Sequence, residues 1–316
     1  MFKSLTYSLF LVCLMMIGCK NQATETTPTQ VSAADSIKLS LAQWSFHRAL
    51  KSGEMNNVDF IHTAKELGFS GVEYVNQFFV NKARDTAFLD QLNAAAKANQ
   101  IQQLLIMVDE EGHLGDLDSI KRVKAVENHK KWIDAAAYLG CHSIRVNAYG
   151  DGNETEVADA VIRSMRALAD YAAKKGLNVI IENHGGYSAN AEWLVEILRR
   201  ADRKNIGALP DFGNFCMKRS NGQLWGSNCI EEYNKYKGVA LMMPFAKGVS
   251  AKSYNFGEMG YETTIDYTKM IEIVLGAGYK GYIGVEYEGD KYSEKDGVIA
   301  TKTLIEKCLN QYKNKG

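Results

Sequence analysis

The sequence predicts an α/β protein with the architecture of a (β/α)8 TIM barrel. From Ile37 onward, short apolar runs typical of buried strands alternate eight times with longer segments of helical periodicity. No change of composition separates these repeats, which indicates one barrel domain over residues 37–316. An open doubly wound sheet would carry a glycine-rich fingerprint after its first strand, and the sequence has none. Eight consecutive strand–helix units therefore favour a closed barrel.

The expected elements follow one another in strict alternation. The strands, rich in Val, Ile and Leu, are expected at Ile37–Trp44, Gly71–Val75, Ile101–Val108, Cys141–Asn147, Leu177–Asn183, Ile206–Phe212, Gly248–Lys252 and Tyr282–Glu288. The amphipathic helices are expected at Val58–Gly68, Phe88–Ala98, Ser119–Leu139, Val157–Lys175, Ala191–Arg200, Cys229–Met243, Ile265–Leu275 and Val298–Tyr312. Several helices end in a glycine, as in ELGF, YLGC, KKGL and GAGY, because glycine adopts the left-handed turn that stops a helix.

The first 36 residues are expected to lie outside the barrel. Lys3 precedes the apolar run Leu9–Gly18, which is short for a membrane span and continues into MIGC. Because MIGC resembles a bacterial lipobox, we predict a lipoprotein signal peptide over residues 1–19, with Cys19 lipidated. Residues 20–36 are polar and threonine-rich, which predicts a flexible tether. The expected protein is extracytoplasmic, lipid-anchored and periplasm-facing; an uncleaved anchor helix is the alternative.

Charge and motif content narrow the class of partner. Lys+Arg and Asp+Glu both number 37, so the formal net charge is zero and nothing favours nucleic acid. No GxxxxGK[ST] motif or suitably placed GxGxxG motif is present to bind a phosphate. We therefore expect an unphosphorylated small-molecule substrate and no membrane contact beyond the lipid anchor. The sequence does not indicate an oligomeric state.

The predicted barrel contains four cysteines, Cys141, Cys216, Cys229 and Cys308. No CxxC pair occurs, which argues against a structural zinc site. We expect four unpaired, mostly buried thiols. The alternative is a disulfide between Cys216 and Cys229, which flank one loop and would pair in an oxidising compartment.

Three of the last four predicted strands end in a carboxylate. Glu182 ends the fifth strand, Asp211 the sixth and Glu286 the eighth. The functional groups of TIM barrels lie at the C-terminal ends of their strands, so these three side chains are expected to converge on the barrel axis. Carboxylates in such proximity repel one another, and a divalent cation relieves the repulsion. The alternative is that each acid separately binds backbone or water.

The motifs ENHGG, PDFGNF, VSAKSY and GYKGYIGVEYEG resemble those of the xylose isomerase-like TIM barrels, over nearly all of the chain from Ile37. That superfamily includes sugar isomerases and epimerases, inosose dehydratases and endonuclease IV. The resemblance implies an isomerase or epimerase that removes the proton next to a sugar carbonyl through an enediolate. It also implies acid/base and metal-ligand roles for Glu182 and Glu286, a ligand role for Asp211, and a catalytic role for Lys252 on a substrate oxygen. Lys252 as a simple ion-pair partner is the alternative.

The seventh strand departs from the family pattern. Family members usually carry His-x-Lys there, with the histidine as fourth ligand, whereas this chain has Ser250, Ala251 and Lys252. His184 lies two residues after Glu182 and therefore on the same face of the strand. We predict that His184 completes a site for Mn²⁺, Co²⁺ or Zn²⁺. Alternatively, His184 only binds substrate or caps the loop.

Further polar and aromatic residues follow the other strands and are candidates for substrate binding. These candidates are Trp44, His47, Glu73, Asp109, Asn147, Trp225 and Ser250. Trp44 beside a polar residue suits a sugar face, with core packing as the alternative. Trp225 lies in the long segment Phe212–Ser227, which is expected to cover the pocket. Arg145 shares a face with Asn147, or else forms a structural ion pair low in the barrel. The other histidines are expected to be structural: His62, His113, His129 and His142.

Two further functions compete with isomerisation. The same enolate can expel a substituent, which would make the protein a 3-keto-glycoside 1,2-lyase or the hydratase of the resulting enone, and the predicted export favours glycosides. A non-catalytic sugar-binding lipoprotein is the second alternative. Ser250 favours binding alone, whereas three converging acids argue against it. The neutral charge, the predicted export and the few histidines disfavour an endonuclease.

Overall fold

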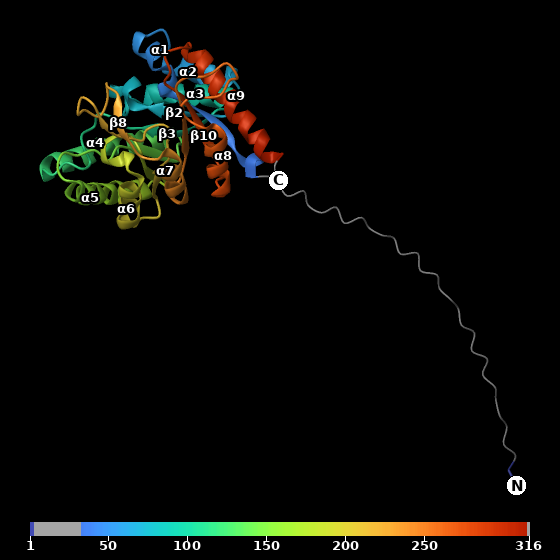
Figure 1. Ribbon diagram of the computed structural model, residues 1–316. Helices are drawn as coiled ribbons and strands as arrows, with labels where there is room; N and C mark the ends of the chain where they lie inside the picture. The colour runs from blue at the N-terminus through green and yellow to red at the C-terminus, as the bar shows by residue number, and fades with distance from the viewer. Residues whose placement is uncertain (3–32, 315–316) are drawn as a thin grey trace. The chain divides into compact units, whose positions relative to one another are not determined.

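A computed structural model describes residues 1–2 and 33–314 (Figure 1). The described residues from Ala33 onward belong to one compact unit, which contains the barrel. The predicted lipobox cysteine Cys19 and the tether up to residue 32 lie outside the described residues.

The predicted TIM barrel is confirmed. Its strands are β1 (Lys38–Ala42), β2 (Gly71–Val75), β3 (Gln102–Met107), β4 (Ser143–Val146), β5 (Asn178–Glu182), β6 (Ile206–Leu209), β9 (Val249–Ser253) and β10 (Tyr282–Tyr287). All neighbours pair in parallel in the order β6-β5-β4-β3-β2-β1-β10-β9. Parallel bridges from Ala208 to Ala246 and from Asp211 to Ser250 close the sheet between β6 and β9.

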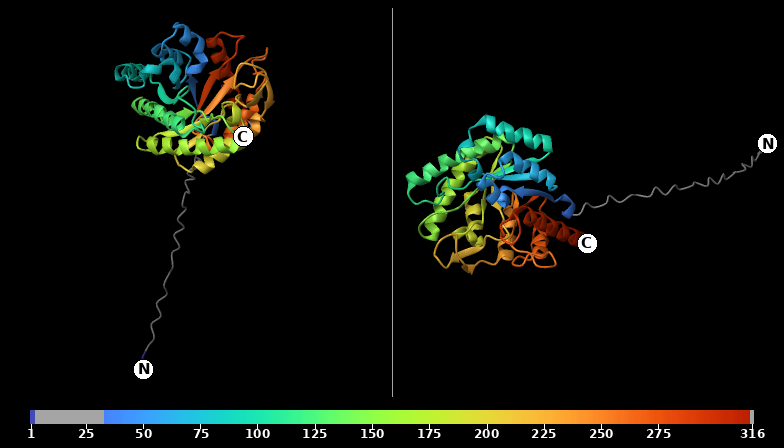
Figure 2. Two further views of the ribbon diagram at one scale, coloured as in Figure 1. Left: turned by 90° about the vertical axis from the view of Figure 1, so that its left-hand side faces the viewer. Right: turned by 90° about the horizontal axis from the view of Figure 1, so that it is seen from above.

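Helices surround this sheet (Figure 2). They are the short α1 (His47–Ser52) and the outer helices α2 (Asn57–Glu66), α3 (Thr86–Asn99), α4 (Ser119–Tyr138), α5 (Glu154–Ala173), α6 (Ala191–Ala201), α7 (Lys235–Met242), α8 (Tyr267–Gly276) and α9 (Glu294–Lys313). Each of the helices α2 to α9 begins after an Asn, Asp or Ser whose side chain accepts a hydrogen bond from the first turn. Such caps satisfy backbone donors that have no partner within the helix.

Two apolar cores result from the alternation of side chains along the strands. The larger core lies between the sheet and the helices and includes Trp132, Phe60 and Tyr287. The smaller one fills the barrel interior with Ala42, Val75, Leu105, Met107, Ile180 and Leu209. The interior of the barrel is therefore a packed core rather than a pore, as in other TIM barrels.

The segment between β6 and α7 differs from the prediction. A two-stranded antiparallel hairpin, β7 (Cys216–Arg219) and β8 (Cys229–Glu232), replaces the first part of the expected helix, and α7 begins only at Lys235. The expectation of four free thiols is also wrong, since a disulfide joins Cys216 to Cys229 with a Cα–Cα distance of 5.8 Å. The disulfide and the cross-strand pairing together hold this segment extended. Cys141 and Cys308 are unpaired and buried.

None of the helices in the described part of the chain is both long enough and apolar enough to cross a lipid bilayer.

The packing of α9 on β10 depends on a glycine inside a helix. A Cβ atom at Gly297 would lie 2.2 Å from the ring of Tyr287, which is 1% exposed. We therefore expect Gly297→Ala to lower the free energy of unfolding by about 1–3 kcal/mol through overpacking. Gly276→Ala in α8 is the matched control, because no atom lies within 4 Å of the added methyl group. Thermal melts of both variants test this prediction, and an equally stable Gly297→Ala protein would contradict it.

Candidate active site

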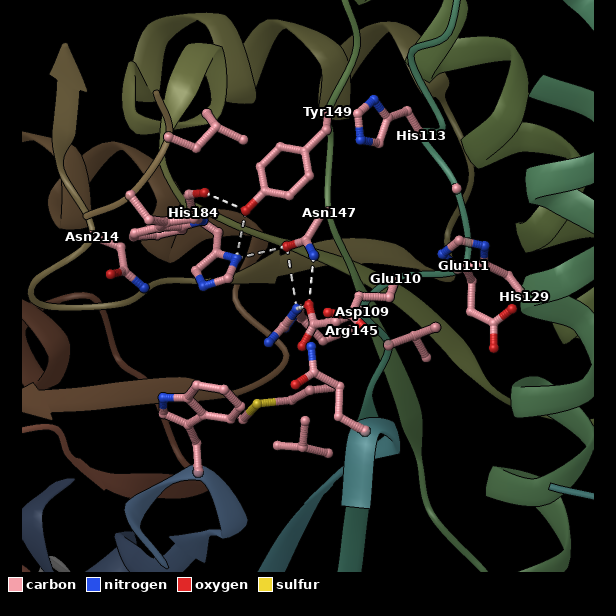
Figure 3. Close-up of a pocket in the computed structure, with 18 of the residues that line it drawn as sticks. Asp109, Glu110, Glu111, His113, His129, Arg145, Asn147, Tyr149, His184 and Asn214 are labelled. Atoms are coloured by element: carbon pink, nitrogen blue, oxygen red, sulfur yellow. Dashed lines mark hydrogen bonds and ion pairs between the residues drawn. The ribbon is translucent and has the colours of Figure 1, made fainter. Parts of the chain in front are cut away.

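The C-terminal ends of the barrel strands surround a cavity of about 760 Å³ (Figure 3). One part of its wall is apolar and aromatic, with Trp44, Val75, Met107, Leu224 and Trp225. The other part is polar and charged, with Asp109, Arg145, Asn147, Tyr149, His184, Asn214, Glu286 and Glu288. The cavity therefore combines an apolar surface with converging polar groups, as small-molecule sites do.

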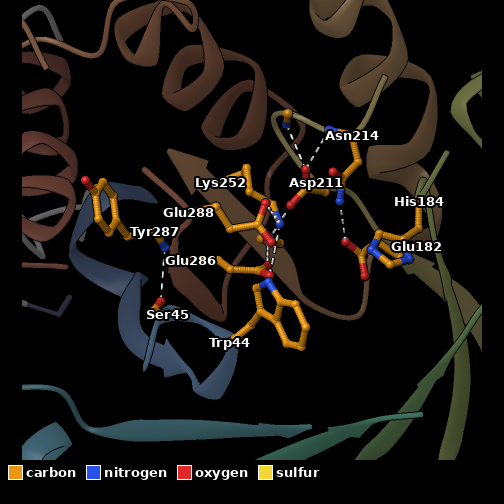
Figure 4. A network of polar contacts seen from close by, with 12 residues as sticks. Trp44, Ser45, Glu182, His184, Asp211, Asn214, Lys252, Glu286, Tyr287 and Glu288 are labelled. Atoms are coloured by element: carbon orange, nitrogen blue, oxygen red, sulfur yellow. Dashed lines mark hydrogen bonds and ion pairs between the residues drawn. The ribbon is translucent and has the colours of Figure 1, made fainter. Parts of the chain in front are cut away.

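Three buried carboxylates meet beside this cavity, and one of them, Glu286, lines it. Glu182 ends β5, Asp211 follows β6, and Glu286 lies within β10. One oxygen of each lies within 4.8 Å of an oxygen of the others, and all three side chains are buried (Figure 4). The sequence predicted this convergence from strand ends alone. Within the described residues, the group of side chains close enough together to hold a metal ion does not include His184.

Asparagine side chains hold two of these carboxylates in place. The Asn183 amide donates to the Asp211 carbonyl at 3.0 Å and accepts from the Asp211 backbone N–H at 2.8 Å. The backbone N–H groups of Gly213 and Asn214 donate to Asp211 Oδ1 at 2.7 and 2.8 Å. Asn214 Nδ2 also donates to Glu182 Oε1 at 3.0 Å. Hydrogen bonds therefore connect the ENHGG motif to the PDFGNF motif at the site.

The side chains of β9 contact the same acids. The Ser250 hydroxyl lies 2.6 Å from Asp211 Oδ2 and 2.9 Å from Glu286 Oε2. Lys252 Nζ lies 3.0 Å from Glu286 Oε1 and 3.3 Å from Glu288 Oε2, and its side chain is 1% exposed. In Figure 4 the Lys252 ammonium points into the group of acids. Ser250, predicted to contact substrate, thus lies among the carboxylates rather than on the cavity wall.

The carboxylates differ in protonation because their neighbours differ. Burial raises the pKa of Glu182 to about 7, although the Arg145 charge opposes the shift. Burial likewise raises the pKa of Asp211 to about 8, against the charge of Lys252. Burial also acts on Glu286, but the Lys252 ammonium and the Ser250 hydroxyl outweigh it and lower the pKa of Glu286.

The donor set fits a divalent cation. Three carboxylates from three strands supply hard oxygen ligands, the chemistry preferred by Mg²⁺ and Mn²⁺. Glu182 Oε2 is buried, and its partner in the described structure is the Arg145 guanidinium, whose Nε lies 2.8 Å away. A cation at this position would relieve the crowding of like charges that burial makes costly.

Arg145 links the carboxylate cluster to the polar wall of the cavity. Its Nε lies 2.8 Å from Glu182 Oε2, and one terminal nitrogen lies 2.7 Å from Asp109 Oδ1. Asn147 Nδ2 donates to the same Asp109 oxygen at 2.6 Å. Burial would raise the pKa of Asp109, but the charge of Arg145 lowers it instead. Arg145 thus lines the cavity while it forms the ion pair that was the alternative expectation.

His184 belongs to this polar wall. Its Nδ1 lies 2.9 Å from Asn147 Oδ1 and 2.8 Å from the Tyr149 hydroxyl. That hydroxyl donates to the His184 carbonyl at 2.7 Å, so Nδ1 is the ring nitrogen that donates and Nε2 is the one with a free lone pair. Burial, assisted by the Arg145 charge, lowers the pKa of His184 to about 4, which makes the ring neutral at pH 7. In this arrangement His184 contacts Asn147 and Tyr149 rather than completing the carboxylate cluster.

The other substrate candidates divide into two groups. Trp44, Asp109, Asn147 and Trp225 line the cavity, whereas His47 and Glu73 do not. The His47 ring stacks on Trp44 at 5.2 Å, and its Nδ1 lies 2.9 Å from the Trp44 carbonyl, so His47 supports Trp44 from behind.

Several lining residues escaped the sequence analysis. Tyr149, Asn214 and Glu288 face the cavity, as do His113 and His129, which were expected to be structural. Tyr149 lies two residues after Asn147, and Glu288 lies two residues after Glu286. Because residues two apart along a strand face the same side, this spacing could have identified both as candidates. His129 still has a structural contact, 2.7 Å from Nδ1 to the Ala125 carbonyl within α4.

A family model described as xylose isomerase-like TIM barrel matches residues 61–308. The chain belongs to this family. A comparison with curated protein sequences finds no match.

Solved structures share the family's fold at low sequence identity. A 3-keto-D-glucoside 4-epimerase from E. coli is 18% identical with a TM-score of 0.62, over 86% of this chain and 99% of the other. A xylose isomerase-like protein from Mycobacterium smegmatis in complex with magnesium is 16% identical, with a TM-score of 0.64 and coverages of 88% and 98%. A D-psicose 3-epimerase from Clostridium cellulolyticum H10, solved with D-tagatose, is 15% identical, with a TM-score of 0.62 and the same coverages. At these identities the likeness concerns the fold.

Glu73 lies inside the barrel, two residues before the end of β2. It accepts a hydrogen bond from Ser40 at 2.6 Å, and its second oxygen is buried without a hydrogen bond. A Cβ atom at Gly284 would lie 2.5 Å from Glu73, so the glycine makes room for this carboxylate. Burial raises the pKa of Glu73 to about 7.

This pKa predicts how stability depends on pH. Between pH 4.5 and 7 the unfolded chain loses the Glu73 proton while the folded protein retains it, so stability falls as pH rises through this range. Glu73→Gln removes that loss and should be more stable than the natural protein at pH 8 by up to about 3 kcal/mol. Below pH 4.5 this advantage disappears. Urea unfolding at several pH values tests this prediction, with Glu258→Gln at an exposed position as control. If the free energy of unfolding of Glu73→Gln varied with pH just as that of the natural protein does, the prediction would be refuted.

Proposed function

We propose that this protein is a metal-dependent isomerase or epimerase of an unphosphorylated sugar. The observation that carries the proposal is the buried cluster of Glu182, Asp211 and Glu286, of which Glu286 lines the cavity. Membership of a family that contains sugar epimerases supports it. The epimerases of similar fold, named for a 3-keto-D-glucoside and for D-psicose, support a ketosugar as the substrate class.

In this proposal Glu182, Asp211 and Glu286 hold the cation. When bound, a divalent cation supplies Lewis-acid polarisation of adjacent sugar oxygens and stabilises an enediolate. Glu182 and Glu286 come from β5 and β10, which β6 and β9 separate in the closed barrel, so they approach a substrate from different directions. Glu182 removes the proton next to the carbonyl, and Glu286 returns or relays it.

Other residues of the chain orient the substrate. Lys252, held by Glu286 and Glu288, presents an ammonium to a substrate oxygen. Asp109 and Asn147 bind hydroxyl groups on the opposite part of the wall, and His184 offers the free lone pair of Nε2. The aromatic face of Trp44 packs on the apolar face of a sugar ring.

The size of the cavity favours one alternative reaction. A volume of about 760 Å³ with an apolar wall accommodates a sugar that carries a second group. In a 3-keto-glycoside, removal of the C2 proton gives an enolate that expels the C1 aglycone with its bonding electron pair, and the aglycone oxygen then takes up a proton. A 3-keto-glycoside 1,2-lyase, or the hydratase that adds water to the resulting enone, therefore uses the same residues. A non-catalytic sugar-binding protein is the remaining alternative, and the replacement of histidine by Ser250 favours it.

The location of the protein remains part of the proposal. We propose lipidation at Cys19, anchoring to the membrane by that lipid alone and exposure to the periplasm. The Cys216–Cys229 disulfide supports an oxidising compartment.

Removal of the metal should abolish activity and lower stability. Treatment with EDTA should lower the melting temperature of the natural protein, and MnCl2 or MgCl2 should restore it, because an ion that binds only the folded state stabilises it. Glu182→Gln should eliminate the ion-dependent shift and reduce turnover about 10²–10⁴-fold. Glu196→Gln, on the exposed face of α6, is the matched control. If the purified natural protein binds no divalent ion by calorimetry, the proposal fails.

The substrate class can be tested with two probes. We expect the protein to convert one of two probes. Conversion of free D-fructose is detected by chromatography of the sugars. Conversion of phenyl 3-keto-β-D-glucoside is detected by the release of phenol. Phenol release without ketose conversion would assign the lyase reaction, and the reverse result would assign isomerisation or epimerisation. Binding of either sugar without turnover, in a metal-loaded protein, would favour the sugar-binding alternative.

A further inference from the structure

The hairpin β7–β8 lies outside the barrel but contributes to the cavity. Its tip carries Leu224 and Trp225, which line the cavity although their side chains are 37% and 41% exposed. Large apolar side chains that remain exposed at the edge of a cavity are typical of a ligand-contacting surface.

The tip of the hairpin has a defined internal structure. Arg219 Nε donates to the Leu224 carbonyl at 2.8 Å, and one of its terminal nitrogens donates to the Ser227 carbonyl at 2.7 Å. The Arg219 guanidinium also lies 5.3 Å from the Trp225 ring centroid. Asn221 Nδ2 donates to the Trp225 carbonyl at 3.1 Å. These contacts hold Trp225 relative to the two strands of the hairpin, so the position of the strands determines the position of the ring.

Trp225 packs directly on the polar wall. Its ring centroid lies 4.8 Å from that of His184. A Cβ atom at Gly185 would lie 3.5 Å from the Trp225 ring, and one at Gly186 would lie 3.0 Å from Leu224. Both glycines have positive φ, of 80° and 56°. The two glycines after His184 therefore let the hairpin tip approach the cavity.

At its base the hairpin packs on the rest of the unit through Phe215 and β7. Phe215 is buried, its carbonyl accepts from the Tyr233 N–H at 2.9 Å, and β7 contacts the turn Gly186–Ala189. An isolated two-stranded hairpin is only marginally stable in water. The Cys216–Cys229 disulfide joins the two strands covalently, so it closes residues 216–229, which include Leu224 and Trp225, into a loop of restricted conformation. Cys229 is exposed and Cys216 is half-buried, so a reductant reaches the bond.

We propose that the disulfide-closed hairpin of residues 216–229 is a specificity element, in which the Cys216–Cys229 bond holds Trp225 against His184 as one wall of the substrate cavity. Reduction of the bond releases this wall and weakens binding of the part of the substrate that contacts Trp225. The inference rests on the proposed function only in assigning the cavity to a sugar derivative; the attachment of the hairpin is independent of it.

The first test measures the hairpin itself and needs no substrate. We compare the oxidised full chain, the same protein reduced with a phosphine, and the double variant Cys216→Ser/Cys229→Ser. Hydrogen exchange followed by mass spectrometry should accelerate in residues 216–232 after reduction and in the double variant, while the barrel strands stay protected. The tryptophan emission should change on reduction of the natural protein but not of Trp225→Phe. Unchanged hydrogen exchange and unchanged emission would overturn the proposal. The other two cysteines of the described barrel, Cys141 and Cys308, are unpaired, so the reductant acts there on the Cys216–Cys229 bond alone.

The second test measures binding with whichever probe is converted, D-fructose or phenyl 3-keto-β-D-glucoside. Reduction should raise KM about fivefold, the size expected from loss of one aromatic contact, with a smaller change in kcat. Trp225→Phe should raise KM less than Trp225→Ala, and reduction should add little to Trp225→Ala. Equal KM values before and after reduction would refute a role in specificity. If neither probe is converted, the proposed function fails, whereas the exchange and emission results still decide whether the disulfide positions the wall.

Discussion

The site depends on the concentration of negative charge that a closed barrel brings to its axis. Glu182, Asp211 and Glu286 are each at most 4% exposed, and their oxygens approach within 4.8 Å. Buried carboxylates at such short distances repel one another strongly unless a positive charge lies beside them or some of them are protonated. Lys252 and Arg145 supply part of that charge from two sides. Much of the polar structure around the mouth, including the Asn183 and Asn214 amides, serves to keep these acids together.

The barrel was predictable because its signals are local and repeated. Eight apolar strands, capped helices and terminal glycines each indicate the same architecture, and the parallel order follows from the alternation of strand and helix. The carboxylate cluster was predictable for the same reason, since the ends of parallel strands meet at one edge of the barrel. The fold and three residues of the site thus follow from pattern alone.

The other features of the site could not be predicted, because they depend on contacts between segments that are far apart in the sequence. Nothing local predicts that His184 contacts the Tyr149 hydroxyl, because Tyr149 lies 35 residues away in the sequence. The sequence does not show that Glu73 points into the barrel, where it is buried beside Ser40, because Ser40 lies 33 residues away. The segment after Cys229 has a pattern compatible with a helix, and only its pairing with Cys216 makes it a strand. Tertiary contacts decided each of these cases.

The position of Arg145 has a consequence for how sequences of this family can diverge. One guanidinium neutralises both Asp109, on the cavity wall, and Glu182, in the cluster. A chain that exchanges Asp109 for a neutral residue, to accept a different ligand, leaves Arg145 with one acid and alters the field at Glu182. Positions 109 and 145 should therefore covary among close homologues, and changes in ligand preference should arise as paired substitutions rather than single ones.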